Sequence, residues 1–285
     1  GETKTNLGSG SKINGAGNVG SRTLVQSTGG VNFGKDINSG GKITLSNGNL
    51  TDIKDNNDGT FTWHWSLTLP HSSYLVMLAA GNFDIVEDNA DGIPIYSYVP
   101  PGRKSDGEIS YKLTADMVNF FNNKIGLIYP WGRFSQIAVE DFIYGGMENT
   151  GAVVLTDISV HNEKTIPDYT ATSLVAHELS HMWWGDAITC KDWHHIWLNE
   201  GFATYGEGVI HEAWYGNADY DNYIVGEMNA AKLAQGSIWV QNINDINEIF
   251  NGYRSYAKGG VVLHMLRGIV GDSTFYDILR AYTAD

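Results

Sequence analysis

Hydrophobic and polar positions alternate most regularly between residues 60 and 69. Apolar side chains occupy every second position there, from Phe61 through Trp63 and Trp65 to Leu69, which is the period of a half-buried strand. A turn sequence at 56–59 precedes this strand. Further apolar runs at 74–80 and 83–86 extend the sheet. We therefore expect residues 1–92 to form a β-rich module, in which the Gly-, Ser- and Asn-rich stretch 6–20 is either loop or short, twisted strands.

Helical spacing dominates the rest of the chain. It predicts helices over 114–126, 169–184, 197–213, 220–234, 253–270 and 275–282, with Gly185 and Gly271 placed to end two of them. Strands are expected at 95–99, 137–142 and 152–156. This mixture predicts an α+β fold in which a second domain, residues 93–285, follows the β-rich module.

Charge and composition narrow the class of partner. The chain of 285 residues carries 32 acidic and 18 basic side chains, a formal charge of −14. Nucleic acid is therefore not expected as a partner, because phosphate binding needs clustered Lys and Arg. An acidic cleft would instead favour cationic groups such as a free amino terminus.

The single cysteine and the first residues of the sequence limit the kinds of site and the processing that we expect for this chain. Cys190 is the single cysteine, which excludes an intrachain disulfide and a cysteine-based zinc cage, and we interpret it as a small buried hydrophobe. No apolar run approaches the roughly 20 residues of a membrane span. The opening Gly1-Glu2-Thr3 lacks an initiator Met, so we expect a processed product or an excised fragment. Composition favours an extracytoplasmic or secreted location slightly over the cytoplasm.

The candidate chemistry is concentrated between residues 177 and 200. His177 and His181 stand four residues apart on an expected helix, so both imidazoles face the same side. Glu200, after a gap of 18 residues, supplies a third ligand from the next helix. Three protein ligands leave one tetrahedral position open, as in a catalytic zinc site that binds one Zn²⁺ ion.

Glu178, between the two histidines, is placed to act as the general base. Zinc lowers the pKa of a bound water to roughly 7, and Glu178 would take its proton and pass it to the leaving amine. The alternative is an ordinary amphipathic helix whose histidines are structural. Glu200 at the required distance argues against that alternative. Glu207, two turns after Glu200, either fixes the ring of a ligand histidine or is a plain surface acid.

Four stretches together resemble the gluzincin zinc aminopeptidases, the family of aminopeptidase N and leukotriene hydrolase. They are residues 145–149 (Gly-Gly-Met-Glu-Asn), 177–186, 197–203 and 256–260 (Tyr-Ala-Lys-Gly-Gly). Their order and separations are family-like and cover roughly residues 140 to 265. The resemblance implies a thermolysin-like zinc peptidase domain, truncated at its carboxyl end and preceded by a partial sheet domain. It also implies that the chain hydrolyses the amino-terminal residue from peptides.

The resemblance also assigns site residues. Glu148 matches the acid that binds the substrate's free α-amine, within a substrate-binding segment formed by Gly145, Gly146, Met147, Glu148 and Asn149. The two glycines suit a backbone that approaches a ligand closely, or a simple turn. Tyr256 matches the tyrosine that stabilises the oxyanion, with Tyr253 as the rival candidate.

Departures from the family leave two alternatives open. Family enzymes are at least twice this long, and a histidine, His195, stands where many members have an acid. A thermolysin-type endopeptidase is disfavoured by the setting of Glu148. A metal-binding fragment with little catalysis, acting as an interaction module, is the other alternative. Five further histidines lack ligand spacing and are interpreted as structural: His64, His71, His161, His211 and His264.

Overall fold

The computed structural model describes residues 5–6, 25–26, 42–58, 60–166 and 168–284. The chain divides into two compact units, residues 1–112 with 131–170 and residues 113–130 with 171–285. Each contains its own packed elements and is described separately. The expected boundary between residues 92 and 93 stays a prediction, and the interpretation of residues 6–20 lies outside the described residues apart from Asn6.

A five-stranded sheet organises the first unit. Its order is β10-β11-β9-β8-β7, where β7 is Asp84–Ala90, β8 is Ile93–Val99, β9 is Phe134–Val139, β10 is Gly146–Met147 and β11 is Ala152–Thr156. The three inner strands are parallel, whereas β7 and β10 run antiparallel at the two edges. β7 and β8 form a hairpin across Asp91 and Gly92, both with positive φ, as a two-residue turn of the primed type requires.

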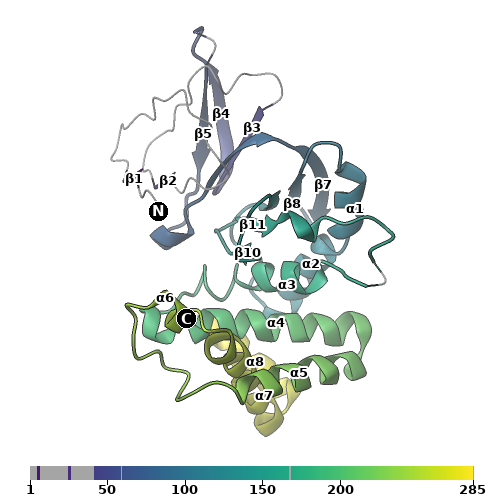
Figure 1. Ribbon diagram of the computed structural model, residues 1–285, viewed down its shortest axis with the longest axis vertical. Helices are drawn as coiled ribbons and strands as arrows, with labels where there is room; N and C mark the ends of the chain where they lie inside the picture. Colours follow the sequence, from purple (N-terminus) through teal and green to yellow (C-terminus); the bar gives the residue numbers. More distant parts are fainter. Residues whose placement is uncertain (1–4, 7–24, 27–41, 59, 167, 285) are drawn as a thin grey trace. The chain divides into compact units, whose positions relative to one another are not determined.

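Smaller strand pairs complete the first unit. β3 (Lys42–Ser46) pairs with β6 (Leu78–Asn82), β4 (Asn49–Asp55) pairs with β5 (Phe61–Ser66), and β1 (Thr5–Asn6) pairs with β2 (Val25–Gln26) (Figure 1). β5 is the strand expected from the alternating pattern. A core of five buried side chains joins the β3–β6 pair to the large sheet: Leu45, Met77, Tyr98, Ile137 and Ala152. One helix, α1 (Lys104–Ser110), and two short 3₁₀ turns, at Ser73–Leu75 and Asp157–Ser159, complete the described elements of this unit.

The second unit is helical, and α4 (Trp197–Tyr215) is its central element. α3 (Thr172–Ser180) packs along one side of α4, while α5 (Asn217–Ala231) and α7 (Gly259–Val270) pack on others (Figure 1). This unit also contains α2 (Thr114–Ile125), the 3₁₀ turn η3 (Trp193–His195), the one-turn α6 (Ile246–Ile249), the π-helical η4 (Gly252–Lys258) and α8 (Asp272–Ala284). α3 and α4 approach closely because Gly206 has no side chain; a Cβ there would collide with the hydroxyl of Ser180. The predicted α+β class is confirmed.

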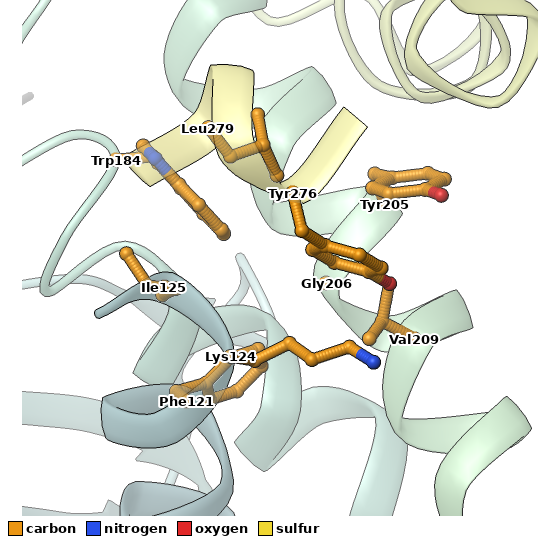
Figure 2. Close-up of a pocket in the computed structure, with 9 residues that line it drawn as sticks. All are labelled: Phe121, Lys124, Ile125, Trp184, Tyr205, Gly206, Val209, Tyr276 and Leu279. Atoms are coloured by element: carbon orange, nitrogen blue, oxygen red, sulfur yellow. The ribbon is translucent and has the colours of Figure 1, made fainter. Parts of the chain in front are cut away.

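Aromatic and aliphatic side chains from α2, α4 and α8 form the core of this unit. They surround a small apolar gap whose lining includes Phe121 and Ile125 from α2, Tyr205 from α4, and Tyr276 and Leu279 from α8 (Figure 2). The ammonium group of Lys124 lies 4.2 Å from the centroid of the Tyr276 ring, a cation–π contact at the edge of the gap. Most of the side chains that line this gap are aromatic or aliphatic, as in a packed core.

Three of the expected helices differ from the structure. The helix expected over 220–234 is α5, which begins and ends three residues earlier. The helix expected over 169–184 ends at Ser180, because the following N–H groups bond three residues back, Met182 to Leu179 and Trp183 to Ser180. The helix expected over 253–270 is two elements, a π-helical segment η4 (Gly252–Lys258) followed by α7. The strand expected at 137–142 is β9, which lies about three residues earlier, and α1 and α6 were not predicted.

Candidate metal centre

Three buried side chains of the second unit converge at the junction of α3 and α4. His177 lies in the last turn of α3, His181 follows that helix directly, and Glu200 lies in the first turn of α4. The two Nε2 atoms are 3.2 Å apart, and Glu200 Oε2 is 3.4 Å from His177 Nε2 and 3.3 Å from His181 Nε2. The side chains are 12%, 1% and 3% exposed, respectively. The sequence spacing therefore brings the three predicted ligands to one point.

This triangle matches the space that one small metal ion needs. Bonds of about 2.0–2.1 Å in tetrahedral geometry place neighbouring ligand atoms about 3.3 Å apart. The three observed separations fall within 0.1 Å of that value. Two imidazoles and one carboxylate are also a donor set that suits zinc. The residues present therefore fit a single four-coordinate ion with one position open.

The second nitrogen of each histidine has an oxygen acceptor. His177 Nδ1 lies 2.8 Å from Glu207 Oε1, and His181 Nδ1 lies 3.1 Å from the carbonyl oxygen of Trp184. Each acceptor selects the tautomer that carries its proton on Nδ1 and leaves the Nε2 lone pair for a metal. Glu207, for which the sequence left two interpretations open, therefore makes the contact that orientation of His177 requires.

Neighbouring charges and burial shift the pKa values of His177 and Glu200 in opposite directions. Burial lowers the pKa of His177, but hydrogen bonds to Glu200 and Glu207 outweigh it and raise this pKa well above its usual value. Burial also raises the pKa of Glu200, yet the charge of His181 and hydrogen bonds from His177 and His181 lower it to about 2. A metal ion and protons therefore compete for the same histidine nitrogens in this site.

Glu178 and Tyr256 are the two residues expected to act in catalysis beside this cluster. Glu178 is 4% exposed on α3, and its charge acts on His177. The ring of Tyr256 stacks on the ring of His177, with centroids 5.8 Å apart and an interplanar angle of 15°. Tyr253 is 49% exposed, so of the two candidates it is Tyr256 that contacts a predicted metal ligand.

The backbone that carries Tyr256 is a π-helix. The N–H of Gly259 bonds to the carbonyl of Arg254, five residues earlier, and the side chain of Asn251 accepts from the N–H of Arg254 at the start of the segment. A π-helix shifts the following side chains relative to an α-helix, so α-helical spacing does not place Tyr256. Segments of this kind occur frequently at functional sites.

The predicted substrate-binding segment belongs to the first unit. Gly146 and Met147 form the edge strand β10, and Glu148, directly after it, is 5% exposed. The hydroxyl of Tyr74 lies 3.4 Å from Glu148 Oε1, and the side-chain amide of Asn149 donates to the carbonyl of Leu75 at 3.2 Å. Sequence reasoning missed Tyr74, because its partner is 74 residues away and no spacing connects them. The position of Glu148 relative to the metal ligands stays a prediction.

Gly145 has a backbone reason to be glycine. Its φ is +78°, in the left-handed region, whereas a Cβ there would meet no atom within 4 Å. Its carbonyl accepts from the N–H of Thr156 at 2.7 Å, which fixes the turn before β10. The turn conformation therefore accounts for Gly145, and close approach of a ligand at Gly145 and Gly146 stays a prediction.

Several other histidines have structural partners. His194 stacks on Trp239 with ring centroids 4.3 Å apart, and His264 Nδ1 lies 2.8 Å from the Tyr220 hydroxyl. His211 bridges α3 and α5 through Ser173, at 2.8 Å, and Asp219. The contacts of His211 and His264 agree with the interpretation that these two histidines are structural.

Two histidines at the end of one helix and a carboxylate from the next helix form a cluster that could hold a metal ion, as in the class of metal-dependent hydrolases. Comparison with known proteins identifies the family to which the chain belongs. The model of the peptidase family M1 domain matches residues 109–285. The chain therefore belongs to peptidase family M1, and the resemblance predicted from the four sequence stretches is confirmed. The expected class, a peptide hydrolase of the metallo-aminopeptidase type, is confirmed at the level of the family.

Similar proteins include aminopeptidase M1 of Arabidopsis thaliana, 32% identical over 224 residues, which cover 74% of this chain and 25% of that protein. Aminopeptidase N of Streptomyces lividans is 30% identical over 260 residues, covering 85% and 30% of the two chains. Leucyl aminopeptidase of Saccharolobus solfataricus is 27% identical over 250 residues, covering 84% and 32%. The chain thus spans about a quarter to a third of the length of these relatives. Within the described residues, none of the helices combines the length and apolar character needed to cross a membrane.

Proposed function

We propose that this chain is the catalytic part of a zinc-dependent aminopeptidase that removes the amino-terminal residue from peptides. The triangle of His177 Nε2, His181 Nε2 and Glu200 Oε2, with sides of 3.2–3.4 Å, carries this proposal. Membership of family M1 and the names of the relatives support the aminopeptidase assignment. Because the chain covers only part of those relatives, their activity is transferred to it as a proposal.

The metal ligands are His177, His181 and Glu200. Bound zinc would supply Lewis acidity and lower the pKa of a water molecule toward neutrality. Glu178 accepts the proton of the attacking water and returns it to the leaving amine, a role that its burial supports because a desolvated carboxylate has a higher proton affinity. The hydroxyl of Tyr256 donates a hydrogen bond to the oxyanion that forms at the carbonyl. A donor of this kind typically raises kcat by a factor of about 10²–10³.

Glu148 selects substrates with a free amino terminus in this proposal. A carboxylate that is 5% exposed gains more from a cationic partner than an exposed one does, because the surrounding dielectric is low. Tyr74 restricts its orientation through the contact at Oε1. An acetylated substrate has no ammonium group for Glu148 to bind, so the proposal requires discrimination against it.

One set of measurements tests the proposal. Zinc content is determined after dialysis, and hydrolysis of an aminoacyl reporter is compared with hydrolysis of its N-acetylated form. We expect one zinc per chain, cleavage of the free-amine substrate, and little cleavage of the acetylated one. Glu178→Gln should keep the zinc and lose nearly all turnover, whereas Glu163→Gln, at an exposed carboxylate, should resemble the parent chain.

Three outcomes contradict the proposal. Equal cleavage of both substrates indicates an endopeptidase. Bound zinc without turnover on any aminoacyl substrate indicates a metal-binding interaction module. Loss of zinc in Glu178→Gln shows that Glu178 is a ligand rather than the general base.

A further inference from the structure

Two glycines bring α4 and the η4–α7 segment into direct backbone contact. A Cβ added to Gly201 would lie 2.7 Å from both Cα and the carbonyl carbon of Gly259. A Cβ added to Gly259 would lie 2.8 Å from Gly201 Cα and 3.4 Å from the carbonyl oxygen of Trp197. Carbon atoms in good contact are about 3.5–4.0 Å apart, so neither backbone has room for a side chain. Only glycine at both positions permits this separation.

Each glycine is adjacent to a part of the candidate site. Gly201 follows Glu200, a predicted metal ligand, in the first turns of α4. Gly259 is the residue whose N–H closes the π-helical turn around Tyr256, since it bonds to the carbonyls of both Arg254 and Tyr256. The contact therefore connects the backbone that carries Glu200 with the backbone that carries Tyr256.

We propose that Gly201 and Gly259 are positioning residues, whose side-chain-free contact sets the distance between the Tyr256 ring and the metal-ligand ring of His177. Glu200 and His177 lie 3.4 Å apart at their nearest side-chain atoms, so α4 is fixed relative to His177. The η4 segment is in turn fixed to α4 at the two glycines. The stacking distance of 5.8 Å between Tyr256 and His177 follows from both constraints.

The expected displacement follows from the overlap. Restoring carbon–carbon contact from 2.7 Å to about 3.5 Å requires the two backbones to separate by about 0.8 Å. A misplacement of about 1 Å in an active site can cost about 10²-fold in rate. The kinetic consequence rests on the proposed function, whereas the geometric consequence, a longer Tyr256–His177 separation, does not.

Gly259→Ala is the main test, with Gly268→Ala as the matched control. Both positions are in α7, but a Cβ at Gly268 meets nothing within 4 Å. We expect Gly259→Ala to lower kcat about 10- to 100-fold with the zinc content and KM little changed, and Gly268→Ala to leave kinetics unchanged. In the Tyr256→Phe background, Gly259→Ala should have little further effect on kcat, because the hydroxyl it misplaces is already absent.

A spectroscopic measurement separates this proposal from the proposed function. The ring-proton NMR resonance of His177 reports the stacked aromatic ring, and Tyr256→Ala provides the unstacked reference. Gly259→Ala should move the resonance toward that reference, and Gly268→Ala should not. If the resonance moves but no chain shows turnover, the proposed function fails and the positioning role stands. An unmoved resonance in folded Gly259→Ala overturns the positioning role, as does an equal loss of kcat in the Tyr256→Phe background.

A milder variant covers the case in which Gly259→Ala does not fold. A Cβ at Gly260 would lie 3.1 Å from Thr204 Cγ2, a side-chain atom that can be removed. Gly260→Ala should therefore shift the His177 resonance by less than Gly259→Ala, and adding Thr204→Ser should restore it. If the resonance of Gly260→Ala stays at its parent position, or if Thr204→Ser does not restore a shifted one, the contact between these segments does not set the stacking distance.

Discussion

The contact between Glu207 and His177 predicts a specific loss of zinc affinity when Glu207 is replaced. Glu207→Ala removes the acceptor 2.8 Å from His177 Nδ1 and leaves both ring orientation and tautomer unfixed. The two side chains are 17% and 12% exposed, so water replaces the lost acceptor only in part. The three ligand atoms themselves are unchanged in this variant.

The size of the effect follows from this burial. Replacing the hydrogen-bond partner of a metal-ligating histidine typically costs 10–100-fold in metal affinity, which corresponds to about 1.4–2.7 kcal/mol. A hydrogen bond to a charged acceptor contributes about 1.5–3 kcal/mol, so the two ranges agree. We therefore expect the zinc Kd of Glu207→Ala to rise 10- to 100-fold. Glu207→Gln, whose amide oxygen still accepts from Nδ1, should lose less.

The assay is competition for zinc against a chromophoric chelator of known affinity, at one pH and ionic strength. Glu227→Gln is the control for charge, because the carboxylate of Glu227 acts electrostatically on both Glu207 and His177 from the neighbouring helix α5. A partly exposed charge is screened by solvent, so this control should change Kd by less than about threefold.

Comparing Glu207→Ala with Glu227→Gln shows whether Glu207 affects zinc binding by orienting the His177 ring or only through its charge. If Glu227→Gln weakens zinc as much as Glu207→Ala does, the effect is one of net charge and Glu207 does not orient the ring. If neither variant changes Kd, the hydrogen bond is incidental to the site. Unfolding must be excluded by a thermal melt, since Glu207 lies in the central helix α4.

Three further predictions concern the tyrosines, a charged cluster and the cysteine. Tyr256→Phe should lower kcat about 10²-fold or more with little change in KM, and Tyr253→Phe should resemble the parent; steady-state kinetics that show the reverse identify Tyr253 as the donor. Arg267→Ala should destabilise the chain by about 2–4 kcal/mol in urea unfolding, because its guanidinium bonds carboxylates of α4 and α8 at 2.8 Å, while the exposed Arg280→Ala should cost less than about 1 kcal/mol; equal costs contradict this account. Burial and the nearby Asp192 raise the pKa of the Cys190 thiol to about 11, so its thiolate fraction and alkylation rate should keep rising with pH beyond 10; a plateau near pH 9 shows an ordinary thiol.

The predictable parts of the site were those encoded by local spacing. His177 and His181 converge because four residues of α-helix return the chain to the same face, and α3 includes that turn. Thr114–Ile125 and Trp197–Tyr215 were recognisable for the same reason, since apolar periodicity survives over three or more helical turns. Glu200 could be predicted as the third ligand because it lies in the first turn of α4, a helix that can face α3.

The parts that sequence reasoning missed depend on hydrogen bonds with non-standard spacing or on distant partners. The π-helical turn before α7 has no periodic signature, because the change is one extra residue between donor and acceptor. The early end of α3 depends on the N–H groups of Met182 and Trp183, which bond three residues back and leave no periodic signature in the sequence. Tyr74 and Glu148 are 74 residues apart in the sequence, and only tertiary structure brings them together.

The glycines of α4 explain how closely two neighbouring segments approach this helix. A Cβ at Gly206 would lie 2.1 Å from Ser180 Oγ, and a Cβ at Gly201 would lie 2.7 Å from Gly259 Cα. Gly206 permits the approach of α3, and Gly201 permits the approach of the segment that carries Tyr256. Each glycine costs α4 about 0.5–1 kcal/mol relative to alanine, a cost that helical propensity alone would select against. Alanine at these positions would separate the groups that must act together. The geometry of the site therefore explains why glycines occur in α4, the longest helix of the described residues.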